Sequence, residues 1–147
     1  MKILILSVGH KMPAWIQEGF QEYAKRMPAE SRIELVEVKP GRDKAEEGRR
    51  LLEALPARAT LFALDERGKA ISTADLAGLL GGWMREAVQP ALAIGGADGL
   101  DDAVKSRAAR AFSLSPLTLP HQLVRVVLAE QLYRASSILA GHPYHRE

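Results

Sequence analysis

Two segments of this chain carry residues whose types and spacing could do chemistry. The first is Gly95-Gly96-Ala97-Asp98-Gly99, which follows a short apolar run and has three glycines within five residues. Glycine lets the backbone turn tightly or approach a ligand closely. The loop therefore predicts either a ligand-binding wall or an ordinary turn between a strand and a helix, and both readings stay open on these residues alone.

The second segment is Leu114-Ser115-Pro116-Leu117-Thr118-Leu119-Pro120. Its two prolines, four residues apart, are incompatible with a helix and unfavourable in a strand. A segment that forms neither must offer its backbone N–H and C=O groups to another partner, because buried polar groups need hydrogen bonds. A flat apolar ligand with hydrogen-bonding edges, such as adenine, meets that need. A packed connector capped by water is the alternative.

Candidates of lower rank lie near the two ends of the chain. His10 and Lys11 follow the first apolar run and could contact a substrate or simply face solvent. His142 and His145 lie in a closing segment without a helical frame or a carboxylate cluster, so we expect no metal site. The nucleophile-elbow pattern G-x-S-x-G and the glycine-rich phosphate-binding patterns are absent.

Alternating apolar and amphipathic stretches must position these segments. Strands are predicted at residues 3–8, 32–38, 60–64, 90–94 and 112–115, with a polar turn at 65–69. Helices are predicted at 13–27, 43–55 and 74–88, from about 101, and from 120 or 121 to 138 or 139. This alternation predicts an α/β fold with a parallel sheet flanked by helices on both faces. In such sheets ligands bind at the carboxyl ends of the strands.

Length and composition narrow the class of protein. The chain has 147 residues, which fits a single domain over residues 1–147. It has no cysteine, which excludes disulfide scaffolds, thiolate metal sites and cysteine nucleophiles. The formal charge of +2 permits a polyanionic partner without requiring one. No apolar run is long enough to span a membrane, and we expect a cytoplasmic protein.

Long ordered strings of residues make the chain similar to a known family. Leu64-Asp65, the loop at 95–99, the segment 114–121 and the closing His142-Pro143-Tyr144-His145-Arg146-Glu147 resemble the RlmH (YbeA-type) family. The resemblance covers the whole chain and includes Val8-Gly9-His10-Lys11-Met12-Pro13. Members of that family are SPOUT-class methyltransferases that act at N3 of a pseudouridine in 23S rRNA. Glu66-Arg67 lies in a variable stretch to which we assign no role.

The resemblance implies a fold, a cofactor and partners. The C-terminal part should thread through a loop to form a trefoil knot, a topology that periodicity cannot predict. S-adenosyl-L-methionine should lie in the knot. By matched positions its wall would be Leu64, Gly96, Leu114, Ser115, Pro116, Leu117, Thr118, Leu119 and Pro120. The resemblance also implies a homodimer that acts on 23S rRNA, with the assembled ribosome as the expected substrate.

The reaction implied is transfer of a methyl group from a sulfonium to an imide nitrogen that must lose its proton. No residue is identified by spacing as the base. We expect His142, Tyr144, His145 and Arg146 to fold over the site and position the substrate, with His10, Lys11 and Arg125 as further candidates. The alternatives are a SPOUT methyltransferase with another rRNA or tRNA target and a non-catalytic ribosome-binding factor. A flavodoxin-like nucleotide-binding domain ranks third.

Overall fold

The computed structural model describes residues 1–146, and Glu147 of the closing segment lies outside the described residues. Strands and helices alternate along the chain. They are β1 (Lys2–Val8), α1 (Ala14–Ala24), β2 (Arg32–Val38), α2 (Lys44–Ala54), β3 (Thr60–Ala70), α3 (Thr73–Arg85), β4 (Pro90–Ile94), α4 (Asp102–Arg107), β5 (Arg110–Ser113) and α5 (His121–Ala140). Short 3₁₀ turns lie at Ala29–Ser31 and Pro143–Arg146. In this part of the chain no helix is both long and apolar enough to cross a membrane.

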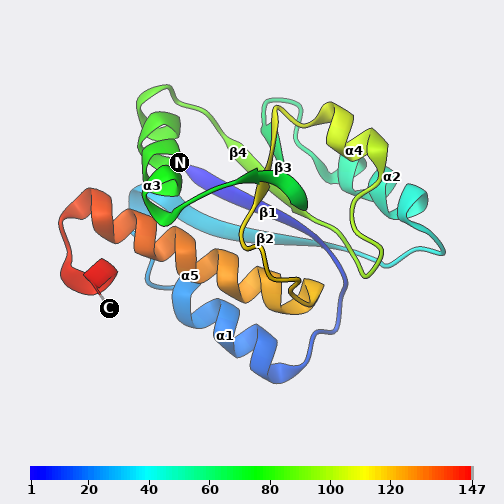
Figure 1. The fold of residues 1–147 in the computed structure, drawn as a ribbon, viewed down its shortest axis with the longest axis horizontal. Helices are drawn as coiled ribbons and strands as arrows, with labels where there is room; N and C mark the ends of the chain where they lie inside the picture. The colour runs from blue at the N-terminus through cyan, green and yellow to red at the C-terminus, as the bar shows by residue number, and fades with distance from the viewer. Residues whose placement is uncertain (147) are drawn as a thin grey trace.

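The strands form one parallel sheet with the order β2-β1-β4-β3-β5. Helices α1, α3 and α5 cover one face and α2 and α4 cover the other (Figure 1). Because both faces are covered, Ile3 and Ile5 are buried under the first layer while Leu4 and Leu6 are buried under the second. The predicted α/β fold with a helix-flanked parallel sheet is confirmed.

The prediction of a polar turn at residues 65–69 is wrong. Strand β3 continues through this stretch to Ala70, and the register with β5 shifts between Leu64 and Lys69. Its polar side chains suggested a turn, but the strand continues past an irregularity at residues 65–68 and pairs with β5 again at Lys69 and Ala70. Gly68 lies so close to β5 that a Cβ there would meet the Ala111 carbonyl carbon at 2.7 Å.

Other elements differ from the prediction mainly at their ends. The fifth strand covers 110–113 rather than 112–115, and the first helix stops at Ala24 rather than 27. Helix α3 stops at Arg85, since Ala87 has a φ of 53° that no helix continues through. Ser72 caps the start of α3: its hydroxyl accepts the Asp75 N–H at 3.0 Å, and the Asp75 carboxylate accepts the Ser72 N–H at 3.1 Å.

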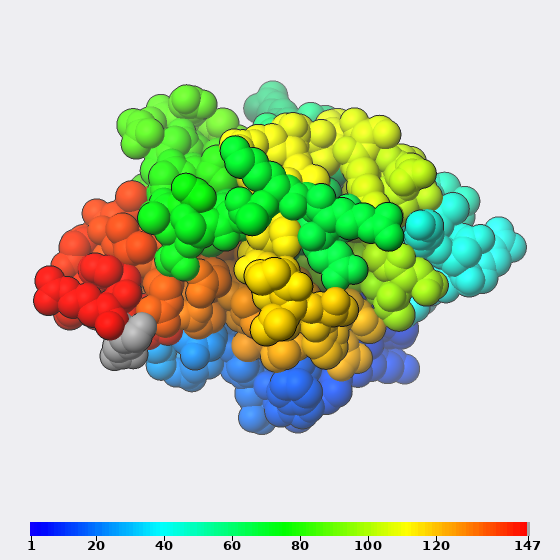
Figure 2. Space-filling view, in the orientation of Figure 1, coloured from blue at the N-terminus to red at the C-terminus, as the bar shows by residue number. Residues whose placement is uncertain are grey.

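The chain after β5 passes under an arch made by the second half of β3 and the turn into α3. Figure 2 shows this arch, residues 65–72 (green), crossing in front of the segment that follows β5 (yellow to orange). Thr118 from the lower segment donates a hydrogen bond to Glu66 of the arch at 3.2 Å. This crossing is the threaded part of the α/β-knot fold, and the segment beneath the arch continues directly into α5.

A buried arginine fixes the first turns of α5 against the sheet. Arg125 is 2% exposed, donates to the Glu37 carboxylate at 2.7 Å, and donates to the Ser7 hydroxyl at 2.9 Å. Its Nε–H is buried without a hydrogen-bond partner among the described residues. Arg125 therefore ties α5 to the carboxyl ends of β1 and β2. Because the Arg125 side chain is almost completely buried, it stabilises the interior and is not accessible to a substrate.

Replacing this arginine tests its structural contribution. Arg125→Met is expected to lower the free energy of unfolding by about 2 kcal/mol, because the Ser7 hydroxyl loses its donor while the half-exposed Glu37 can still be solvated. Urea unfolding measures the change. Arg49→Met removes an exposed arginine 3.9 Å from Glu53 and should have no measurable effect. Equal stability of the two variants would contradict the assignment.

Candidate functional site

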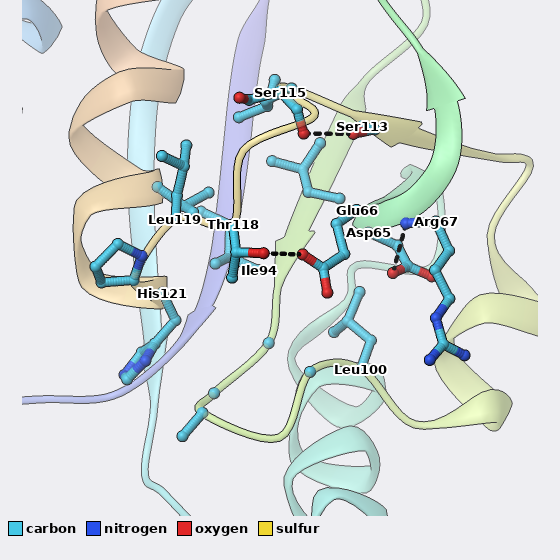
Figure 3. A pocket seen from close by; sticks show the side chains of 18 of the residues that line it. Asp65, Glu66, Arg67, Ile94, Leu100, Ser113, Ser115, Thr118, Leu119 and His121 are labelled. Atoms are coloured by element: carbon cyan, nitrogen blue, oxygen red, sulfur yellow. Dashed lines mark hydrogen bonds between the residues drawn. The ribbon is translucent and has the colours of Figure 1, made fainter.

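A cavity of about 690 Å³ lies beside the middle of β3 and at the carboxyl ends of β4 and β5 (Figure 3). It brings together all the predicted cofactor-binding residues except Pro116. Those that line it are Leu64, Gly96, Leu114, Ser115, Leu117, Thr118, Leu119 and Pro120. The loop of 95–99 and the segment beneath the arch, which are separate in the sequence, thus form walls of the same cavity.

The glycine loop is both a tight turn and a wall of the cavity. A Cβ at Gly95 would lie 2.5 Å from the Gly99 carbonyl atoms, and the Gly99 N–H donates to the Gly96 carbonyl at 3.0 Å. Gly99 has a φ of 81°, in the region that favours glycine. The sequence left a turn and a ligand-binding wall as alternatives. The structure shows the turn, and the same residues line the cavity.

A carboxylate that the sequence did not single out supports this loop from behind. Glu47 on α2 is 9% exposed, and its Oε2 accepts the Gly41 N–H at 3.1 Å. A Cβ at Gly96 would lie 3.0 and 3.2 Å from the two Glu47 carboxylate oxygens. Nothing in the sequence distinguished Glu47, because it lies in a strongly charged helix whose acidic residues read as a solvated face.

The segment beneath the arch uses only some of its hydrogen-bonding groups for bonds within the segment. The Ser113 hydroxyl donates to the Ser115 carbonyl at 3.0 Å, and the Ser115 hydroxyl accepts the Leu117 N–H at 2.9 Å. The backbone N–H and C=O groups of Thr118 and Leu119 make no hydrogen bond to another described residue. Both residues line the cavity beside apolar side chains, a combination that suits a flat heterocycle with polar edges.

Charged side chains of both signs surround the cavity. Lys105 forms an ion pair with Asp65 at 3.2 Å, and Glu66 accepts the bond from Thr118 across the opening (Figure 3). Lys44 and Arg67 also line the cavity. The Glu66-Arg67 stretch, to which the sequence gave no role, thus belongs to the rim. The described residues contain no group of three or more side chains arranged to hold a metal ion.

The closing segment lies outside the cavity and packs on the far half of α5. The Tyr144 hydroxyl donates to Glu130 at 3.3 Å, its ring lies 4.6 Å from that of Tyr133, and the Arg134 guanidinium lies 4.8 Å from the Tyr144 ring centre. Burial, followed by the nearby Glu130 carboxylate, raises the pKa of Tyr144 to about 12, so this phenol stays protonated at neutral pH.

This position separates the predicted tail residues from the cavity of their own chain. Helix α5 has 20 residues and is about 30 Å long. Pro120 and His121 line the cavity at its start, whereas His142, Tyr144, His145 and Arg146 follow its end. Figure 1 shows the C-terminus (red) at the opposite end of α5 from the segment that follows β5. The structure therefore gathers the predicted cofactor residues but not the predicted positioning residues.

Comparison with known proteins identifies a family model and relatives that match this chain over nearly its full length. A family model described as "Predicted SPOUT methyltransferase" matches residues 1–145. A protein of Ralstonia nicotianae named "Ribosomal RNA large subunit methyltransferase H" is 57% identical over 99% of this chain and 99% of its own length. The protein of the same name from Nitrosospira multiformis is 54% identical, also over 99% of both chains.

Solved structures share the fold at low sequence identity. A probable methylase family protein from Haemophilus influenzae is 11% identical with a TM-score of 0.57, over 97% of this chain and 69% of that one. The SpoU methyltransferase AviRb from Streptomyces viridochromogenes, solved with the cofactor AdoMet, is 13% identical with a TM-score of 0.50, over 91% and 57% of the two chains.

Proposed function

Because the chain belongs to the SPOUT methyltransferase family, we propose that it transfers the methyl group of S-adenosyl-L-methionine to N3 of a pseudouridine in large-subunit rRNA. It is an S-adenosylmethionine-dependent rRNA methyltransferase, like the full-length relatives that carry that name. The observation that carries the proposal is the cavity beneath the arch, which unites a glycine turn with a backbone segment whose polar groups are free for a ligand.

The residues that line the cavity fit the cofactor. A volume of about 690 Å³ falls in the range of small-molecule sites. Leu64, Leu114 and Leu119 supply apolar surface for the adenine, and the backbone groups of Thr118 and Leu119 supply partners for its polar edge. The bound cofactor supplies an electrophilic methyl group on its sulfonium. The chain's part is to hold that group in a fixed direction, which the glycine loop and its Glu47 support favour.

We propose further that the tail acts at the cavity of a second copy in a homodimer. The tail is held on α5 by Glu130 and Tyr133, and Glu130 lies about 14 Å along the helix axis from His121 at the cavity. Closing over its own cavity would require the tail to leave both residues. If the tail acts at the cavity of a second chain, it keeps its contacts with Glu130 and Tyr133. Exposed apolar side chains on α1 and α5, Trp15 at 61% and Leu139 at 47%, supply surface for such a partner.

In this arrangement the tail orients the uracil ring and contacts phosphates of the target nucleotide. The tail residues involved are His142, Tyr144, His145 and Arg146. Tyr144 keeps its proton at neutral pH and donates it to Glu130, so its hydroxyl oxygen can accept a hydrogen bond from a uracil N–H. Alignment of the imide nitrogen with the methyl group supplies most of the rate, since well-oriented reactants reach effective molarities of about 10⁵–10⁸ M.

The proposed substrate is the assembled ribosome in the cytoplasm rather than free RNA. With a formal charge of only +2, the chain lacks the basic excess that binds RNA of any sequence. A structured ribosomal surface can instead be recognised by shape. A different rRNA or tRNA target remains the second candidate, because the loops and tail, rather than the fold, select the nucleotide.

A single assay tests the reaction and the substrate together. Ribosomes from a strain lacking this modification are incubated with the protein and labelled S-adenosyl-L-methionine, and the modified nucleoside is identified by mass spectrometry. We expect 3-methylpseudouridine in large-subunit rRNA from assembled particles and little transfer to naked RNA. Label in another nucleoside would refute the proposed target, and cofactor binding without any transfer would refute the proposed reaction.

A further inference from the structure

The loop between β1 and α1 lies where ligands of parallel sheets are expected. Strands β1 and β4 are neighbours, yet β1 leads to β2 on one side and β4 leads to β5 on the other. Their connections also leave to opposite faces, since α1 and α4 cover different sides of the sheet. In sheets of this kind ligands bind at such a switch point, beyond the carboxyl ends of the two strands.

The carboxyl ends of β1 and β4 lie next to the cavity proposed for the cofactor. A Cβ at Gly96, at the end of β4, would lie 3.2 Å from the Val8 side chain at the end of β1. On α5, His121 lines the cavity, and Arg125, one turn later, lies under the loop. A nucleotide entering toward the cofactor from the β1 side would therefore meet residues 9–12 (Figure 1).

The loop is held rigidly from below. The Gly9 N–H donates to the Val38 carbonyl at 2.8 Å, and the Gln17 side chain donates to the Met12 carbonyl at 2.8 Å. Gly9 has a φ of 122°, and a Cβ there would lie 2.7 Å from Met12 Cε and 3.7 Å from Arg125 Nη2. The buried Arg125 cluster thus forms the floor of this loop.

Lys11 has an unusual conformation for which the fold gives no local reason. Its φ is 54°, in the left-handed region where residues other than glycine are strained. The other non-glycine residue of this kind in the described chain, Ala87, follows the end of α3, where the Val88 N–H closes a turn on the Trp83 carbonyl. Lys11 closes no helix. Its exposed ammonium group makes no ion pair with another described residue.

We propose that Lys11 is a substrate-binding residue whose ammonium group binds a phosphate of the target rRNA beside the modified nucleotide. The proposal rests on the proposed function. A rigid loop at the switch point presents the unpaired Lys11 ammonium group beside the cavity proposed for the cofactor. A lysine ammonium is a compact partner for a phosphate oxygen.

Two substitutions separate the charge from the backbone. Lys11→Asn removes the cation, and asparagine tolerates the left-handed conformation, so folding and cofactor affinity should be unchanged. Lys11→Arg keeps the charge. We expect Lys11→Asn to lower kcat/KM for large-subunit particles about tenfold, mainly through KM, and to reduce the salt slope of particle binding by about 1. Lys11→Arg should recover most of the activity.

The control is Lys2→Gln at the opposite end of β1, where the lysine pairs with Glu34 on the surface. It should match the unsubstituted protein in transfer and in cofactor binding by calorimetry. The phosphate contact would be overturned by full transfer activity of Lys11→Asn. It would also be overturned if this variant lost cofactor affinity by the same factor as it lost kcat/KM. If the unsubstituted protein methylates no large-subunit particle, the proposed function itself fails and this inference fails with it.

Discussion

Removal of residues 144–147 is expected to lower kcat for methyl transfer to ribosomal particles by at least about 100-fold while changing cofactor affinity less than about threefold. The physical reason is separation: Tyr144 contacts Glu130, Tyr133 and Arg134, and none of these three residues lines the cavity of its own chain. Single-turnover transfer measures the first quantity, and calorimetric titration with S-adenosyl-L-methionine measures the second.

Mixing two inactive variants tests whether the tail acts across a dimer. A chain without residues 144–147 keeps its cavity, and a Gly95→Ala chain keeps its tail. A mixed dimer then contains one intact cavity served by the partner's intact tail, and transfer should reappear on mixing. If the mixed dimer forms, as shown by gel filtration of differently tagged chains, and stays inactive, the tail does not act across the dimer. Unchanged turnover of the truncated chain alone would reject a role for the tail.

Gly95→Ala is expected to weaken cofactor binding by at least about 100-fold. Its Cβ would lie 2.5 Å from the Gly99 carbonyl atoms, a contact with backbone that no side-chain rotation can relieve, so the turn that forms the cavity wall must move. Calorimetry with S-adenosyl-L-methionine measures the loss. Circular dichroism checks that the variant remains folded.

Gly78→Ala is the matched control for this substitution. Gly78 lies in the exposed part of α3, and a Cβ there would have no atom within 4 Å. Alanine should leave cofactor affinity unchanged and raise the free energy of unfolding by about 0.5–1 kcal/mol, because glycine is a poor helix former. Equal cofactor affinities for the two variants would show that the turn at Gly95 does not shape the site.

The sequence predicts the parts of the fold that depend on burial. Strands β1, β2 and β4 and helix α5 are found within one or two residues of their predicted bounds, because apolar runs and faces determine them. The cavity walls at 95–99 and 114–120 were also found, since clustered glycines and spaced prolines restrict the backbone strongly. The second half of β3 was missed because residues 65–69 are polar, and because local pattern does not reveal that the strand pairs with β5 again at Lys69 and Ala70.

Three features could not be predicted from local pattern. Glu47 and Arg125 look like ordinary surface charges in the sequence, and only tertiary contacts bury one behind Gly96 and the other under β1 and β2. The threading beneath the arch depends on the order in which distant segments cross. It came from the family resemblance, because periodicity carries no information about which segment passes in front.

The crossing beneath the arch also sets the order in which the protein can mature. Synthesis runs from the N-terminus, so residues 65–72 and β5 leave the ribosome before the segment 114–120 and α5. The arch therefore has nothing to cross until the segment 114–120 has been made. A nascent or prematurely terminated chain without this segment lacks one wall of the cofactor pocket, so methyl transfer begins only late in the synthesis of each molecule.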